Sequence, residues 1–215
     1  MQEEHEIYWT PRTIPPLEHS SIGNYRLEYI IIQTGCSIVY LGTDLRSGDK
    51  TVLKFIKRQK DREHRIQNET AIMTMIDHPN ILKVLDKYEY RQFYCLVLPY
   101  AAGGSLHRII ESQYPNGLPE HTARVIFHQM LSAVKHLHGI GVMHRDIKLD
   151  NFLVAQWDLQ NPIIQLADFG FAKQFAVGEL GNEYLGTPEY ASPEMYRHIP
   201  CMIFFISFLF LQNSF

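Results

Sequence analysis

The 215-residue sequence has no excess of basic residues, because 20 lysines and arginines stand against 23 aspartates and glutamates, a formal net charge of −3. This balance supplies no positive field for capturing nucleic acid, so no nucleic-acid partner is expected. Cysteine is scarce as well, with three residues and no spacing typical of a zinc site or a redox pair. The composition therefore favours a reduced intracellular setting.

Neither a signal peptide nor a membrane span is expected. The first 19 residues, MQEEHEIYWTPRTIPPLEH, are acidic and interrupted by proline, without the charged and apolar regions of a signal peptide. The uncharged apolar run 201–211 has 11 residues, whereas a helix needs roughly 20 to cross a bilayer. These features predict a cytoplasmic protein.

The patterning predicts a mostly β part followed by a mostly α part. Five segments rich in valine, isoleucine and tyrosine predict the strands of a small antiparallel sheet: 25–32, 37–44, 51–57, 81–90 and 93–100. Apolar residues at three- and four-residue spacing predict one helix between Ile66 and Ile76. After a glycine-containing connector at 101–105, a second helix is predicted over 120–138, with an apolar face formed by Ala123, Ile126, Phe127, Met130, Leu131, Val134 and Leu137.

Two short polar segments carry the side chains suited to chemistry, HRDIKLDN at 144–151 and ADFG at 167–170. Their order and spacing resemble the eukaryotic protein kinases of the serine/threonine type, and most closely the calmodulin-dependent and AMP-activated-like group. The resemblance extends over about 25–194. It implies a protein-kinase-like α+β fold, in which an N-lobe of antiparallel sheet with one helix precedes an incomplete, mainly helical C-lobe.

The resemblance assigns a role to each polar side chain of these segments. Asp146 is expected to accept the proton of an incoming hydroxyl, and Lys148 to stabilise charge on the transferred phosphoryl group. Asn151 and Asp168 offer the oxygen ligands that Mg²⁺ prefers. The alternative, in which the aspartates merely cap loops and Lys148 is a solvated charge, is usual for an isolated aspartate but is disfavoured by the ordered set.

The segments before the catalytic loop supply the expected ATP site. In TVLK at 51–54, Lys54 is the expected ligand of the α- and β-phosphates, and Glu69 is the candidate for its ion-pair partner. The segment CLVLPYAAGGSL resembles the kinase hinge, with Leu98 as gatekeeper. The expected contacts to the adenine are the Pro99 carbonyl, the Ala101 N–H and the side chains of Val39, Val52 and Leu153.

The glycine-rich loop departs from the kinase pattern. Aligning the loop on Val39 places Ile32, Thr34 and Ser37 at the three glycine positions, and only Gly35 remains, one residue out of register. Glycine lets backbone N–H groups approach phosphate closely, so weaker ATP binding is expected. An alternative alignment has one residue deleted from the loop.

The expected organisation is an N-terminal extension at 1–24, a partial kinase domain at 25–194 and an atypical apolar tail at 195–215. The domain divides into an N-lobe at 25–101 and a C-lobe start at 102–194. The expected function is ATP- and Mg²⁺-dependent phosphorylation of serine or threonine on protein substrates, since Lys148 and Thr187 resemble the serine/threonine branch. The alternative is a pseudokinase-like binding module or a non-functional truncated fragment. The oligomeric state is left open.

Overall fold

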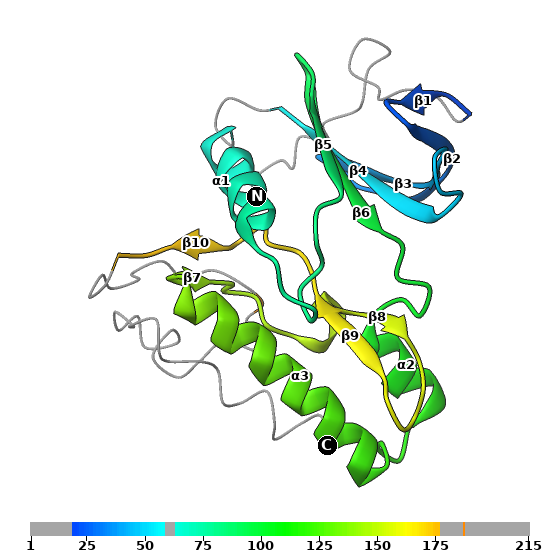
Figure 1. The fold of residues 1–215 in the computed structure, drawn as a ribbon, viewed down its shortest axis with the longest axis vertical. Coiled ribbons are helices and arrows are strands. Elements are labelled where there is room, and N and C mark those ends of the chain that lie inside the picture. The colour runs from blue at the N-terminus through cyan, green and yellow to red at the C-terminus, as the bar shows by residue number, and fades with distance from the viewer. Residues whose placement is uncertain (1–18, 59–62, 177–186, 188–215) are drawn as a thin grey trace, which may run out of the picture. The chain divides into compact units, whose positions relative to one another are not determined.

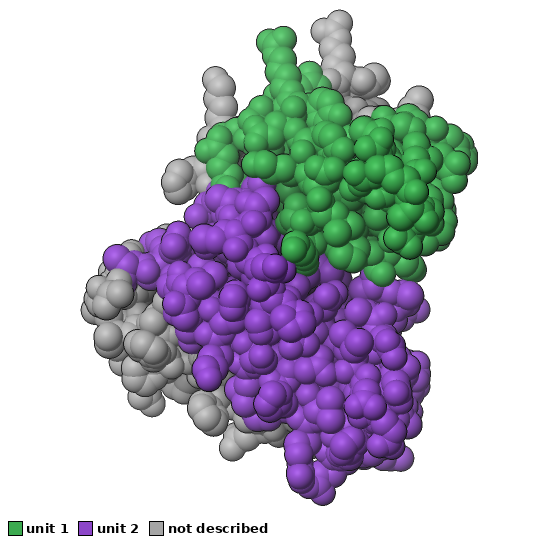
Figure 2. Space-filling view, in the orientation of Figure 1, with its two compact units in different colours: residues 1–67, 83–100 green, residues 68–82, 101–215 purple. Residues whose placement is uncertain are grey.

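The computed structural model describes residues 19–58, 63–176 and 187. The chain divides into two compact units, residues 1–67 with 83–100 and residues 68–82 with 101–215, which are coloured separately in Figure 2. The expected tail at 195–215 and the end of the expected kinase domain at 188–194 lie outside the described residues. No helix in the described ranges combines the length and hydropathy that a membrane span requires.

Unit 1 is built on a six-stranded sheet with the strand order β1-β2-β3-β4-β6-β5 (Figure 1). All five strand pairs are antiparallel, as predicted. The strands are β1 Ser21–Ile22, β2 Tyr25–Gln33, β3 Ser37–Asp44, β4 Lys50–Lys57, β5 Asp86–Glu89 and β6 Phe93–Pro99.

One face of this sheet forms the core of unit 1. Leu53 and Phe55 of β4 are fully buried and alternate with the half-buried Val52 and Lys54, as the two-residue repeat of a strand requires. Phe55 packs edge-on against Tyr40 of β3 and Phe93 of β6, with ring centroids 5.5 and 5.3 Å apart. Aromatic contacts of this geometry stabilise a core beyond the area they bury.

The predicted strand 81–90 is shorter than expected, because only Asp86–Glu89 joins the sheet. Ile81 instead forms a parallel bridge with Leu166, and the Leu82 N–H donates to the Leu166 carbonyl at 2.9 Å. These two residues belong to unit 2. An apolar run alone therefore does not reveal that its backbone hydrogen bonds are divided between two partners.

Helix α1, Glu63–Met75, begins in unit 1, and its residues from Asn68 onward belong to unit 2. Unit 2 also contains the helices α2 Leu106–Gln113 and α3 Glu120–Gly139 and the 3₁₀ turn Leu149–Asn151. Its short strands are β7 Val142–Met143, β8 Phe152–Gln156, β9 Ile163–Leu166 and β10 Lys173–Gln174. β8 pairs with β9 and β7 with β10, both antiparallel.

Helix α3 matches the predicted range and ends one residue later, at Gly139. Its buried residues are Thr122, Ile126, Met130, Ala133, Val134 and Leu137, whereas Leu131 is 49% exposed. The placement of Leu131 on the buried face was therefore wrong. Gly141 follows with φ +73°, a conformation that glycine adopts without strain. Its carbonyl accepts a hydrogen bond from the Phe175 N–H at 2.8 Å.

Candidate active site

The candidate catalytic loop follows β7 and is held by a buried histidine. His144 is 3% exposed, and its Nε2 lies 3.0 Å from the Ala167 carbonyl oxygen. Its Nδ1 accepts the Asp146 N–H at 3.3 Å, so Nε2 carries the ring proton and donates it to Ala167. The ring also meets Phe169 edge-on at 4.8 Å. His144 thereby joins the 144–151 loop to the 167–170 segment.

Asp146 is 5% exposed, and both carboxylate oxygens accept hydrogen bonds. Oδ1 accepts the Thr187 N–H at 2.9 Å and the Thr187 hydroxyl at 2.6 Å. Oδ2 accepts Asn151 Nδ2 at 2.9 Å and lies 3.0 Å from Lys148 Nζ. Burial by itself would raise the pKa of Asp146, but the hydrogen bonds from Thr187, Lys148 and Asn151 outweigh it and lower the pKa. Asp146 is therefore an ionised, oriented carboxylate at neutral pH.

Lys148 completes a ring of contacts with Asp146 and Thr187. Its Nζ donates to Thr187 Oγ1 at 2.6 Å while it pairs with Asp146 Oδ2, and 21% of its side chain is exposed. The ammonium group is thus fixed beside the carboxylate. A fixed cation of this kind stabilises negative charge on a group that approaches Asp146.

Asn151 and Asp168 differ in their surroundings. Asn151 is buried, and its Nδ2 donates to the Asp146 carbonyl at 2.7 Å as well as to the carboxylate. Because both neighbours are acceptors, the amide nitrogen faces them, and the oxygen Oδ1 takes no part in these two hydrogen bonds. Asp168 is exposed and has φ +60°, a left-handed conformation that is uncommon for a residue with a side chain.

These two oxygen donors fit a magnesium ion held together with phosphate oxygens. Mg²⁺ is usually bound through one or two protein oxygens, substrate phosphates and water, and not by a complete protein cage. No group of three or more acidic, histidine or cysteine side chains suited to a metal occurs among the described residues. The assignment of Asn151 and Asp168 as magnesium ligands stays a prediction.

Glu69 is 7% exposed and lies close to the ADFG segment within unit 2. A Cβ atom built on Gly170 would lie 3.4 Å from Asp168 Oδ1 and 3.8 Å from Glu69 Oε2. The neighbouring Asn68 donates its Nδ2 to the Ala172 carbonyl at 3.0 Å. Helix α1 thus contacts the segment that follows Asp168.

In unit 1, the expected nucleotide contacts share one face of the sheet. Val39 pairs directly with Lys54 across β3 and β4, and Val52 pairs with Leu98 across β4 and β6. Directly opposed residues in antiparallel strands lie on the same face. Val39, Val52 and Lys54 are half-buried, and Leu98 is 7% exposed. The pairing of Lys54 with Glu69 joins residues of different units and stays a prediction.

The segment at the position of the glycine-rich loop is a tight hairpin between β2 and β3. The Thr34 N–H donates to the Ser37 carbonyl at 2.8 Å, so that Gly35 and Cys36 form a two-residue turn. The Thr34 hydroxyl accepts the Ser37 N–H at 3.0 Å and lies 2.9 Å from the Ser37 hydroxyl. The strand register pairs Gln33 with Ile38 and Ile32 with Val39. The hydrogen bonds of the Thr34 side chain thus stabilise the turn that contains Gly35.

The hinge segment is joined to β8 in unit 2. The Gly103 N–H donates to the Val154 carbonyl at 3.1 Å, and the Val154 N–H donates to the Gly104 carbonyl at 2.8 Å. Ser105 forms an antiparallel bridge with Leu153. The expected adenine contact Leu153 therefore lies beside the 101–105 segment that begins with Ala101, while Pro99 ends β6 in unit 1.

Sequence reasoning treated Thr187 only as a marker of the serine/threonine branch and missed its contact with Asp146. The two residues are 41 positions apart, and no local pattern signals their hydrogen bonds. It likewise missed that Arg145, at φ +67°, donates its Nε to the Phe171 carbonyl at 2.6 Å. Both contacts tie the catalytic loop to residues that follow Asp168.

The family model of the protein kinase domain matches residues 27–201, and the chain therefore belongs to the protein kinase family. This assignment confirms the predicted kinase fold, with an antiparallel sheet and one helix followed by part of the helical lobe. A curated relative, described as a probable serine/threonine-protein kinase KIN1 homolog of Enterocytozoon bieneusi (strain H348), is 30% identical over 197 residues. The matched region covers 91% of this chain and 32% of the relative, so the chain spans about a third of that protein's length.

Proposed function

We propose that the protein transfers the terminal phosphoryl group of ATP, with Mg²⁺, to serine or threonine hydroxyls of protein substrates. The observation that carries this proposal is the ring formed by Asp146, Lys148 and Thr187, with Asn151 hydrogen-bonded to the same carboxylate. It offers an ionised base, a fixed cation and an oriented amide within one loop. Membership of the protein kinase family supports phosphoryl transfer as the reaction in which these groups act.

In this proposal Asp146 orients the acceptor hydroxyl and takes its proton, since its lowered pKa keeps it ionised at neutral pH. Lys148 stabilises the negative charge that develops on the transferred group. Asn151 and Asp168 would hold the magnesium ion, which when bound neutralises charge on the phosphates. Lys54, paired with Glu69, would bind the phosphates from unit 1.

The adenine contacts are proposed on the same basis. Val39 and Val52 are half-buried on the sheet face that also bears Lys54, which suits an apolar ring next to a phosphate ligand. The remaining proposed contacts are Leu98, the Pro99 carbonyl, the Ala101 N–H and Leu153. Gly35, in the two-residue turn, is the position where a backbone N–H can approach phosphate most closely.

The serine/threonine preference is supported by two observations. The direct contact of Lys148 with Thr187, at 2.6 Å, links the two residues that resemble the serine/threonine branch. The curated relative is described as a probable serine/threonine-protein kinase. Protein substrates and a cytoplasmic location are part of the same proposal.

A second candidate is a pseudokinase-like module that binds nucleotide without transferring phosphate. The hairpin between β2 and β3 favours it, because Thr34 and Ser37 bring Cβ atoms and a hydroxyl pair to positions where the family has glycine. Crowding of the phosphate approach would weaken binding and misplace the terminal phosphate. The two candidate functions differ in one measurable property, the transfer of phosphate from ATP to a protein substrate.

The test compares the full-length chain with Asp146→Asn in an ATP·Mg²⁺ transfer assay and a thermal-shift assay. We expect Asp146→Asn to abolish transfer and to retain the nucleotide-induced shift, because the proton acceptor is lost and the nucleotide ligands remain. Asp150→Asn is the matched control, since Asp150 lies in the same loop and 47% of its side chain is exposed. Equal transfer rates for wild type and Asp146→Asn would remove Asp146 from its role. A nucleotide shift without transfer by wild type would favour the pseudokinase-like module.

A further inference from the structure

Helix α1 has little intrinsic stability of its own. Its sequence, EHRIQNETAIMTM, contains Asn68 and the β-branched residues Thr70, Ile72 and Thr74, which are weak helix formers. The Thr74 hydroxyl bonds back to the Thr70 carbonyl at 2.9 Å, a contact that slightly destabilises a helix. Isolated helices of about this length are marginal in water. The order of α1 therefore depends on tertiary contacts.

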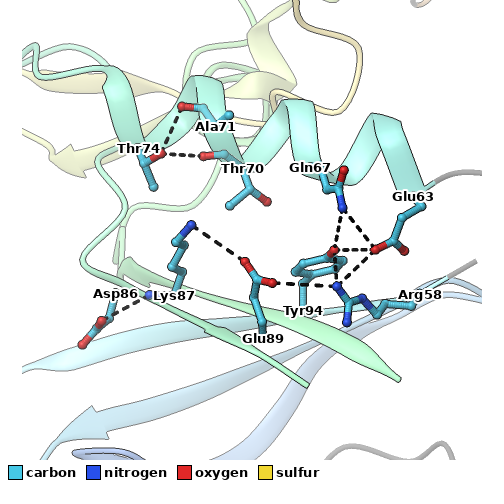
Figure 3. A network of polar contacts seen from close by, with 10 residues as sticks. All are labelled: Arg58, Glu63, Gln67, Thr70, Ala71, Thr74, Asp86, Lys87, Glu89 and Tyr94. Atoms are coloured by element: carbon cyan, nitrogen blue, oxygen red, sulfur yellow. Dashed lines mark hydrogen bonds and ion pairs between the residues drawn. The ribbon is translucent and has the colours of Figure 1, made fainter. Parts of the chain in front are cut away.

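The first two turns of α1 are anchored by a polar network that lies entirely within unit 1 (Figure 3). Tyr94 of β6, which is 2% exposed, donates its hydroxyl to Glu63 Oε1 at 2.6 Å. Arg58 NH2 donates to the Tyr94 hydroxyl at 2.5 Å and lies 3.1 Å from Glu63 Oε1. Gln67, one turn after Glu63, donates its Nε2 to Glu63 Oε1 at 3.4 Å.

Arg58 is itself held in place, so the network is more than an exposed ion pair. Its guanidinium carbon lies 4.2 Å from the centroid of the Tyr94 ring, and NH1 donates to the Tyr90 carbonyl at 2.9 Å. The Arg58 N–H donates to the Gln92 carbonyl at 2.9 Å, and Glu89 lies 3.8 Å from NH2. Charge-assisted hydrogen bonds within such a network are stronger than an isolated surface pair.

The anchored turns belong to the helix that carries Glu69. Glu69 follows Glu63 by six residues, which is roughly 9 Å along a helix axis. Helix formation is cooperative, so in a helix of low intrinsic stability the turn that carries Glu69 depends on the turns before it. Fraying that begins at Glu63 therefore weakens the turn that carries Glu69.

We propose that Tyr94 and Arg58 are positioning residues that hold the first turns of α1 to the sheet and thereby keep Glu69 in its working place. This inference rests on the proposed function, in which Glu69 aligns the phosphate-binding Lys54. The Tyr94 hydroxyl is the centre of the polar network, because it accepts a hydrogen bond from Arg58 and donates one to Glu63. Nothing in this role requires Tyr94 to touch nucleotide.

The first test is hydrogen–deuterium exchange of the full-length chain, which does not depend on activity. Tyr94→Phe removes only the hydroxyl, and we expect roughly tenfold faster exchange of the α1 amides, as the loss of one charge-assisted hydrogen bond predicts. The amides of β3 and β4 should keep their wild-type rates. Tyr90→Phe is the matched control, since the network uses only the Tyr90 carbonyl and this ring is 39% exposed. Unchanged α1 exchange in Tyr94→Phe, or an equal rise throughout unit 1, would overturn the proposal.

The second test links the network to Glu69 by kinetics. Tyr94→Phe should lower kcat about tenfold and leave the KM for the peptide substrate unchanged, whereas Glu63→Gln, which keeps an acceptor oxygen, should retain more activity than Glu63→Ala. In a Glu69→Gln background, Tyr94→Phe should cause no further loss of kcat. A full additional loss there would show that Tyr94 does not act through Glu69. If the wild type transfers no phosphate, the proposed function fails, and the exchange measurement still decides whether Tyr94 holds α1.

Discussion

Thr187 donates two hydrogen bonds to a single oxygen of Asp146, from its N–H at 2.9 Å and from its hydroxyl at 2.6 Å. The same hydroxyl accepts a hydrogen bond from Lys148. A residue that follows the ADFG segment in sequence is thus hydrogen-bonded to two residues of the candidate catalytic loop. Its hydroxyl fixes the direction in which the Asp146 carboxylate and the Lys148 ammonium point.

Replacing Thr187 by valine keeps the shape of the side chain and removes this hydroxyl. We expect kcat to fall roughly 10- to 100-fold, because one hydrogen bond to a charged group contributes about 1.5–3 kcal/mol. Thr187→Ser, which retains the hydroxyl, should stay close to wild type. Steady-state phosphorylation of a peptide measures both variants, and wild-type kcat in Thr187→Val would exclude an orienting role for the hydroxyl.

The stability of the protein should decrease as the pH falls below about 7. Burial lowers the pKa of His144 below its ordinary value of 6.5 and keeps the ring neutral in the folded chain. The unfolded chain binds a proton as the pH falls through 6.5, so the unfolded state gains stability until the folded-state pKa is reached. Each such histidine contributes a slope of at most about 1.4 kcal/mol per pH unit.

Urea unfolding of wild type and His144→Asn between pH 5 and 8 measures this slope. The variant is expected to be less stable throughout and to show a flatter dependence on pH. Burial also lowers the pKa values of His78 and His138, so part of the slope should persist in the variant. Identical slopes in the two proteins would contradict the assignment of His144 as a neutral buried ring.

Gly103→Ala should destabilise the hinge segment. A Cβ atom at Gly103 would lie 2.7 Å from Val154 Cβ and 2.9 Å from the Val154 carbonyl oxygen, so the backbone would have to move. We expect a loss of about 1–3 kcal/mol in the free energy of unfolding, the usual cost of overpacking. Gly139→Ala is the control, because among the described residues no heavy atom outside the adjacent residues and the helix's own nearby backbone lies within 4 Å of a Cβ at that position. Equal denaturant midpoints for the two variants would show that the hinge accommodates the methyl group.

Two cysteines should differ strongly in reactivity. Burial raises the pKa of Cys95 to about 12, and the residue lies in the sheet core, whereas Cys36 is partly exposed on the β2–β3 turn. In a Cys201→Ser background, a thiol reagent at pH 8 should modify Cys36 first. Cys95 should react on the order of a thousandfold more slowly, since thiolate fraction and access control the rate. Simultaneous modification of both thiols in the folded protein would refute this picture of the core.

Much of the fold could be predicted because its signals are local. The strands with alternating buried residues, such as β4, and the 3.6-residue repeat of α3 reflect which side chains each element can bury. The segment 81–90 shows the limit of this reasoning. Its residues are apolar enough for one strand, but Ile81 and Leu82 find their hydrogen-bond partner in Leu166. A composition signal cannot choose between partners that are remote in sequence.

The candidate site divides in the same way. Asp146, Lys148 and Asn151 lie within six consecutive residues, and their geometry follows from one loop. Thr187 contacts that loop from 41 positions further along the chain, so no local pattern predicts the contact. For the same reason, the contact of Tyr94 with Glu63 has no signature in the sequence, because the two residues are 31 positions apart.

By itself, the sequence determined most strands of the sheet, the helices α1 and α3, the family resemblance and the residue types of the candidate catalytic loop, because these depend on residue types at short spacing. Only the tertiary structure decided which distant hydroxyl orients Asp146 and what anchors the first turns of α1. Each of these contacts brings together atoms from separate elements. Their energies depend on distances and angles that exist only once the backbone has folded.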